Sequence, residues 1–141
     1  MSYSTTITTI VRQAGLSDIS SPATLTGIQI PPLETTITFG SPLLVKDGIG
    51  VLGHANLQML TLLSDNLDAT VTLCSDNAGA TPIATIALVA GYAYEWDTSK
   101  GASPLGSTDC LSIKVVLSQT VGGVASTLTT SGFHARSSLS G

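Results

Sequence analysis

The sequence predicts an all-β fold, a β-sandwich or jelly-roll-like barrel, and three observations carry this prediction. Apolar residues recur with a period of two along several segments, as in strands with one buried face. Clusters of Asp, Asn, Ser and Gly separate these segments, for example at Ser64–Asp68, Ser75–Gly79 and Gly122–Gly123. No convincing amphipathic helix of ten or more residues interrupts them. We therefore expect short strands joined by polar turns.

The clearest strand patterns are Leu33–Phe39 and Leu111–Leu117, in which apolar and polar residues alternate. Such alternation places one set of side chains in the core and the other toward solvent. The expected inward residues are Leu33, Ile37 and Phe39 in the first segment, and Leu111, Ile113, Val115 and Leu117 in the second, with Ser112 and Lys114 pointing outward.

A third segment, Asn56–Leu63, is apolar on both faces, which is expected of a central strand that is covered on each side. A helix stays possible there, because periodicity cannot settle a short apolar run. The Thr-rich segments 69–75 and 124–130 alternate more loosely, and branched Thr side chains suit a pleated surface. Further strands are expected near residues 54–64, 69–75, 82–89, 91–97, 110–118 and 124–131.

The two ends of the chain differ from the middle. Residues 1–23 contain a β-prone segment followed by a polar stretch, and we predict an extended N-terminal arm. Residues 24–131 are expected to form the β-sandwich domain, and residues 132–141 a short C-terminal tail. The arm could pair with the sheet edge of a neighbouring subunit or close the chain's own sheet, and the sequence leaves both open.

The composition predicts a protein that associates with other protein surfaces. Of 141 residues only 10% are charged while 43% are hydrophobic, against about 25% charged in a typical domain. Charges keep a free monomer soluble, so a surface this poor in them tends to associate. We therefore expect partners among copies of the chain itself or other proteins.

Other partners are not predicted. The net charge is −4, and the few basic residues form no cluster that could neutralise phosphates, so we expect no nucleic-acid binding. The N-terminus lacks the pattern of a signal peptide, and the longest strongly apolar run, 82–94, is too short to span a bilayer. We expect synthesis in the cytoplasm, no membrane contact, and reduced core thiols at Cys74 and Cys110.

The residues that could support catalysis or metal binding are few and scattered. His54 and His134 lie in no motif with a nucleophile, and Gly-x-Ser-x-Gly is absent, so we predict no enzyme. The cysteines and histidines lack zinc-ligand spacing. Acidic turn residues at 65–68 and 76–77 offer oxygen ligands, yet turn chemistry explains them without calcium. The sequence therefore predicts neither a metal nor a cofactor.

One strand carries both aromatic and acidic side chains. Glu95 and Asp97 flank Trp96, so the two carboxyl groups would share a face, and paired carboxylates occur in glycosidases. An aromatic strip with acids could also bind a sugar by stacking and hydrogen bonding. The competing interpretation is structural, since Tyr92, Tyr94 and Trp96 could fill the sandwich or anchor an interface. We favour the structural interpretation and keep glycan contact as the alternative.

The order of segments from about Leu57 to Val116 resembles β-sandwich subunits common among virion proteins of tailed phages. An apolar strand is followed by an Asp/Asn turn and a Thr-rich strand with another polar turn. An apolar strand then leads to Ala90–Trp96, a Ser/Gly/Pro loop at 99–108, and the strand beginning at Asp109. The resemblance covers a little over 40% of the chain and rests on the order of the segments and on their general composition. It implies a capsid-decorating, head-fibre or tail-associated structural protein with no catalytic residues, and a supporting role for Trp96.

Our hypothesis from the sequence is a virion structural protein that assembles with itself or decorates a capsid or tail. A carbohydrate-binding β-sandwich module is the alternative, and a small hydrolase ranks last. In the assembly hypothesis, specific contacts need one or more buried anchors. The expected interface anchors are Tyr92, Tyr94 and Trp96, followed by Ile7, Ile10 and Val11 of the arm.

Overall fold

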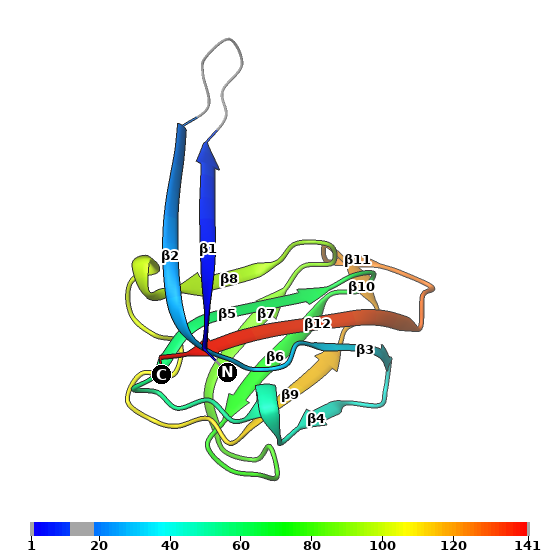
Figure 1. The fold of residues 1–141 in the computed structure, drawn as a ribbon. Helices are drawn as coiled ribbons and strands as arrows, with labels where there is room; N and C mark the ends of the chain where they lie inside the picture. Colours follow the sequence, from blue (N-terminus) through cyan, green and yellow to red (C-terminus); the bar gives the residue numbers. More distant parts are fainter. Residues whose placement is uncertain (1, 12–18, 141) are drawn as a thin grey trace.

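The computed structural model of the chain describes residues 2–11 and 19–140, and it confirms the all-β prediction. Two antiparallel sheets lie face to face as a sandwich, and a two-stranded arm projects from it (Figure 1). The helical elements of the described residues are two 3-10 turns, η1 (Gly48–Gly50) and η2 (Thr98–Lys100). The strands are β1 (Ser2–Val11), β2 (Ile19–Gln29), β3 (Leu33–Thr38), β4 (Leu43–Val45), β5 (Leu57–Ser64), β6 (Ala69–Cys74), β7 (Pro82–Leu88), β8 (Tyr94–Asp97), β9 (Ser112–Leu117), β10 (Thr120–Val121), β11 (Val124–Ala125) and β12 (Thr130–Leu139).

Sheet A, as we name the larger sheet, has the strand order β1-β2-β12-β5-β8. Strand β12 is its central element and pairs with β5 along one side. Along its other side β12 pairs first with β3, from Thr130 to Ala135, and then with β2 at Ser138 and Leu139. Two successive segments of the N-terminal third therefore share one edge of the last strand of the chain.

The segment predicted as a C-terminal tail is this central strand, so that prediction is wrong. Phe133 and Ala135 are buried inward, while His134 and Arg136 alternate with them on the outer face. The period of two was present in the sequence, but Ser, His and Arg kept the segment polar. Serines 131, 137 and 138 are nevertheless buried.

Sheet B, the second sheet, has the order β4-β9-β6-β7 and packs on the inner face of sheet A. Its inward residues include Val71 and Leu73 of β6 and Ile113 and Val115 of β9, as the alternation predicted for Leu111–Leu117. Burial of this apolar surface is the main stabilising contribution to such a domain. The fully buried large side chains are Phe133, Leu52, Leu60, Leu62, Leu67, Leu73, Leu105, Ile113, Val71 and Val115.

Two residues lie opposite to the predicted alternation, and a third, Leu111, was expected inward but precedes β9 and is only half-buried. Ser112 is buried rather than outward, because its hydroxyl donates to the carbonyl oxygen of Asp76 at 2.6 Å beneath the β6–β7 turn. Phe39 is exposed rather than inward, because β3 ends at Thr38 and the chain turns there. Both exceptions arise where a strand meets a turn.

Strand β5 corresponds to the segment Asn56–Leu63, for which the sequence left both strand and helix open. It is a strand and not a helix, and it lies centrally between β12 and β8. Leu60 and Leu62 are buried against sheet B, as expected. The opposite face, with Met59, Thr61 and Leu63, is only half-buried, so the prediction of cover on both sides is wrong. The described part of the chain places no second layer there.

The segment predicted as a strand near residues 124–131 divides instead into two parts. Strand β11 holds only Val124 and Ala125, which pair with β10 across a turn at Gly122 and Gly123. Both glycines have positive φ, 58° and 82°, which glycine adopts without steric cost and which suits a two-residue hairpin turn. Residues 126–129 are irregular, and β12 then begins at Thr130.

The N-terminal arm is a long hairpin rather than a single extended segment. Strands β1 and β2 pair antiparallel over their full described length, from Ser2 opposite Ile28 to Val11 opposite Ile19. Only the base of β2 joins the body, through Gln29 opposite Ser138 and Ile28 opposite Leu139. The rest projects away from the sandwich (Figure 1), so the arm extends to Gln29 and not to residue 23.

Candidate functional site

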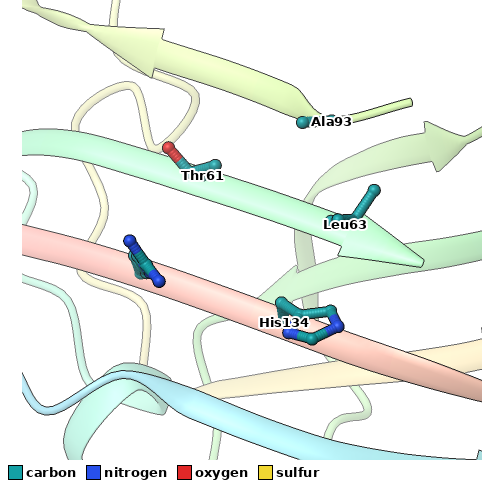
Figure 2. A pocket seen from close by; sticks show the side chains of 5 residues that line it. Thr61, Leu63, Ala93 and His134 are labelled. Carbon is teal, nitrogen blue, oxygen red and sulfur yellow. The ribbon is translucent and has the colours of Figure 1, made fainter. Parts of the chain in front are cut away.

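The outer face of sheet A carries a shallow hollow beside its central strands. Because side chains alternate along a strand, the residues between the inward Phe133, Ala135 and Leu62 face away from the core. The hollow measures about 200 Å³, which is below the 300–1,000 Å³ range of ligand pockets. Figure 2 shows side chains that line it from β5, β12 and the segment before β8. They are Thr61, Leu63, Ala93, His134 and Arg136.

One wall of this hollow is a histidine held between two carboxylates. His134 Nε2 lies 2.8 Å from Asp65 Oδ2, and Nδ1 lies 3.7 Å from Glu34 Oε1. The hydrogen bond that the ring donates to Asp65 raises the pKa of His134, burial lowers it, and the charges of Asp65 and Glu34 raise it further. A general base needs a free, unprotonated nitrogen. This arrangement favours the protonated ring, which links β3, β12 and the turn after β5.

The second predicted candidate histidine is also paired with a carboxylate. His54 Nδ1 lies 2.6 Å from Asp109 Oδ1, and the backbone N–H of His54 donates to the same oxygen at 2.9 Å. These contacts, the backbone hydrogen bond first, lower the pKa of Asp109. They join the segment before β5 to the segment before β9. The structure therefore gives both histidines a role in connecting segments that are distant in sequence.

The three aromatic residues predicted as interface anchors do not share one face. Trp96 is 7% exposed and packs in the core, because β8 pairs Trp96 with Leu60 and directs it inward. Tyr94, opposite Leu62, is half-buried against the same core, and burial raises its pKa. Tyr92 precedes β8 and is 73% exposed. Trp96 thus takes the core alternative, and Tyr92 alone of the three offers most of its ring to a partner.

The two acids of this strand are also separated. Asp97 is buried and caps η2, accepting from the backbone N–H of Ser99 at 2.8 Å and from the Ser99 hydroxyl. Glu95 is exposed and lies 3.8 Å from Lys100 Nζ. The pair does not form a shared carboxylate site. With Trp96 and Asp97 both buried, the carbohydrate alternative lacks the aromatic and acidic platform on which it depended.

The acidic turns bind backbone groups of the protein itself. Asp76 accepts from the backbone N–H of Ala80 and Thr81, and the bond from Thr81 contributes most to lowering its pKa. Among residues 2–11 and 19–140, no group of three or more His, Cys, Asp or Glu side chains is placed to hold a metal ion. Cys74 and Cys110 are free and buried, and burial raises the pKa of each thiol.

A single carboxylate, that of Asp68, organises one end of the sandwich. It accepts from the backbone N–H of Ala90 at 2.9 Å, of Gly122 at 2.9 Å and of Gly123 at 2.8 Å. The hydroxyl of Thr120 donates to it at 2.8 Å. These bonds, led by the one from Ala90, lower the pKa of Asp68 to about 2. The turn after β7 and the β10–β11 hairpin are thereby fixed to one anchor.

Apolar side chains project into solvent around this anchor. We call this surface the Asp68 end; it comprises the turn 89–92, the β10–β11 hairpin and Leu128. Val124 is 71% exposed and Tyr92 is 73% exposed. The two sequence stretches that build it, 77–94 and 115–133, contain no Asp, Glu, Lys or Arg. The other exposed apolar residues of the Asp68 end are Val89, Val121 and Leu128.

Sequence reasoning found the turns of this region but missed how they are joined. Ser64–Asp68 and Gly122–Gly123 were identified as turns from their composition. The bond between Asp68 and Gly122 spans 54 positions, and no local pattern announces it.

The predicted arm anchors lie in strand β1, for which the structure describes the path and pairing of the backbone. Ile7, Ile10 and Val11 lie in β1 opposite Ala23, Ser20 and Ile19 of β2. Their side chains lie outside the described part of the structure. Strand β1 forms one edge of sheet A, so along its length it pairs only with β2.

Comparison with known proteins identified no relative: no family model, curated protein or solved structure matches the chain. Among residues 2–11 and 19–140, none of the helical segments has the length and apolar character that a membrane-spanning helix requires.

Proposed function

We propose that this chain is a non-enzymatic structural protein of a virion, which assembles with copies of itself through its N-terminal arm. The observation that carries the proposal is the projecting β1–β2 hairpin. It contains ten antiparallel residue pairs, yet only two residues of β2 pair with the body. An isolated two-stranded hairpin is at best marginally stable in water. A neighbouring surface would supply the third strand or the packing layer that the arm lacks.

The surface chemistry supports the same proposal. The chain has few charges to oppose contact between copies, and several large apolar side chains remain exposed on the body. A standard specific interface buries about 1,600 Å² in total. Repeated contacts in a lattice need only moderate affinity each, because many act together. The location in a phage particle rests on the resemblance of residues 57–116 to virion β-sandwich subunits.

The test introduces a charge into the arm and measures the mass of the assembly. Ile7→Asp places a carboxylate in the middle of β1, which a neighbouring subunit could bury only at high cost. We expect the wild-type mass in size-exclusion chromatography with light scattering to rise with concentration, and the variant to remain monomeric. The fluorescence of Trp96, the only tryptophan, reports whether the core stays folded.

Val51→Asp is the matched control, since Val51 is an exposed apolar residue of the body. It should assemble like the wild type. A wild-type chain that stays monomeric at about 100 µM, or an Ile7→Asp variant that still assembles, would contradict arm-mediated self-assembly. The virion location has its own test: antibodies against the folded chain should label phage particles from its source, and unlabelled particles would contradict it.

A further inference from the structure

The arm and the Asp68 end lie at opposite ends of the molecule. Strand β12 begins at Thr130, shortly after the β10–β11 hairpin, and its other end pairs with the base of the arm at Ser138 and Leu139. Ten residues of strand span about 33 Å. Figure 1 shows the same separation, with the arm and both termini on the left and β10–β11 on the right. The arm of one chain therefore leaves the body at the end that lies far from its own Asp68 end.

The Asp68 end has the properties of a preformed docking surface. Two turns that are 30 residues apart in sequence are fixed to one carboxylate by three backbone N–H groups and one hydroxyl. Because backbone donors hold them, the exposed side chains between these turns are presented in a defined arrangement. Tyr92 and Val124 project furthest into solvent. Aromatic and aliphatic anchors of this kind carry much of the energy in protein interfaces.

The arm matches this surface in charge and in reach. Strands β1 and β2 contain no Asp, Glu, Lys or Arg, and neither do the stretches that build the Asp68 end. Contact of β1 and β2 with this surface would bury no charged side chain of these strands, and the Asp68 carboxylate already accepts four hydrogen bonds. The arm is about 33 Å long, whereas a compact domain of about 100 residues has a radius of gyration of about 13 Å. It is long enough to reach across a neighbouring body.

We propose that the arm of one copy docks on the Asp68 end of a second copy, in head-to-tail order. This inference rests on the self-assembly proposed above and names the surface that receives the arm. Each copy then offers one arm and one receiving surface at opposite ends. Such heterologous contacts generate a ring where the rotation between copies closes, and an open filament where it does not.

The first experiment places a charge on the receiving surface. Val124→Asp is well suited, because Val124 is 71% exposed and its side chain contributes little to the core. We expect at least a tenfold loss of association in light scattering, as for Ile7→Asp, with unchanged Trp96 fluorescence. Val124→Thr serves as the shape-conserving variant and should assemble within about threefold of wild type. The matched control is Val51→Asp, because Val51 is far from the Asp68 end. Its neighbour Leu52 pairs with Cys110, which precedes β9, whereas the β10–β11 hairpin follows β9.

The second experiment identifies the contacting segment in the full-length chain. A photo-cross-linking amino acid replaces Val124, and equal amounts of ¹⁴N- and ¹⁵N-labelled protein are mixed and irradiated. Trypsin cleaves after Arg12, so residues 1–12, which contain all of β1, form a separate peptide from every body segment. We expect mixed-isotope cross-links between the peptide containing residue 124 and the peptides covering residues 1–12 and 13–46.

The outcomes separate the two proposals. Loss of assembly with both Ile7→Asp and Val124→Asp, together with cross-links to peptide 1–12, supports the head-to-tail contact. Loss with Ile7→Asp but normal assembly of Val124→Asp, with cross-links confined to body peptides, overturns this inference and leaves arm-mediated assembly standing. A wild-type chain that is monomeric at every concentration overturns both.

Discussion

The arm and the body of this protein use the same kind of strand under opposite conditions. In the body, β12 has neighbours on both edges and a second sheet across its inner face. In the arm, β1 has one neighbour, β2, and β2 meets the body at only two residues. A strand gains stability from cross-strand pairs and from burial of one face. The body is therefore stabilised by its own contacts, whereas the stability of the arm depends on what lies beside it.

Removing the buried tryptophan should destabilise the body more than any other change considered below. Trp96→Ala should lower the free energy of unfolding by about 3–5 kcal/mol, because a large buried side chain is replaced by a cavity. Urea denaturation followed by circular dichroism measures the change. Trp96→Phe is the control and should cost much less, since a phenyl ring fills much of the space of the indole and Nε1 has no hydrogen-bond partner among the described residues. An alanine variant as stable as the wild type would contradict the core role.

The second effect acts on the Asp68 end. Asp68→Ala should cost about 1–2 kcal/mol, because three backbone N–H groups and the Thr120 hydroxyl lose a charged acceptor. The pKa of Asp68 is lowered from 3.8 to about 2, so its stabilising contribution is present above about pH 4 and lost as the pH falls toward 2. The difference between wild type and variant, measured by urea denaturation from pH 2 to pH 6, should therefore grow with pH. A constant difference would contradict this assignment.

A smaller effect concerns the histidine on the outer face of sheet A. His134→Gln should cost about 0.5 kcal/mol at pH 5, since the ion pair with Asp65 is partly exposed and screened by solvent. The pKa of His134 is raised above 6.5, so the contribution is complete below that pH and is lost as the pH rises through the folded-state value. A double-mutant cycle with Asp65→Asn at pH 5 and pH 9 measures it. A coupling that is larger at pH 9 would reverse the predicted sign.

The smallest effect on stability is expected in the arm. Ile7→Asp should change the free energy of unfolding of the monomeric body by less than about 0.5 kcal/mol, because β1 pairs only with β2. The same change is expected to abolish assembly. Hydrogen exchange should show fast exchange of arm amides in the monomer and protection on assembly. Slow exchange of the arm in the monomer would mean that the arm needs no neighbour.

The sequence predictions succeeded where the buried face of a strand is apolar, and failed where polar residues obscure the same alternation. The alternation in Leu111–Leu117 correctly predicted that Ile113, Val115 and Leu117 are buried, because one buried face imposes a period of two. The same alternation is present in β12, where Phe133 and Ala135 are the buried residues. It was overlooked because buried serines and outward His134 and Arg136 made the segment resemble a polar tail.

The candidate sites show where sequence reasoning stops. The aromatic cluster was found, yet the sequence left open whether Trp96 lies in the core or at an interface. The register of β8 against β5 decided this by placing Trp96 opposite Leu60. The importance of Asp68 could not be predicted, since three of its donors come from residues 90, 122 and 123.

The sequence alone determined that this chain is made of strands, that its surface carries few charges, and where its turns lie. These features depend on local periodicity and composition, which each segment carries by itself. Only the tertiary structure decided that the final strand is the centre of a sheet, that Trp96 is buried, and that the arm and the Asp68 end lie at opposite ends of β12. Those facts depend on pairing between segments up to about a hundred residues apart, and such pairing is set by the packing of the whole chain.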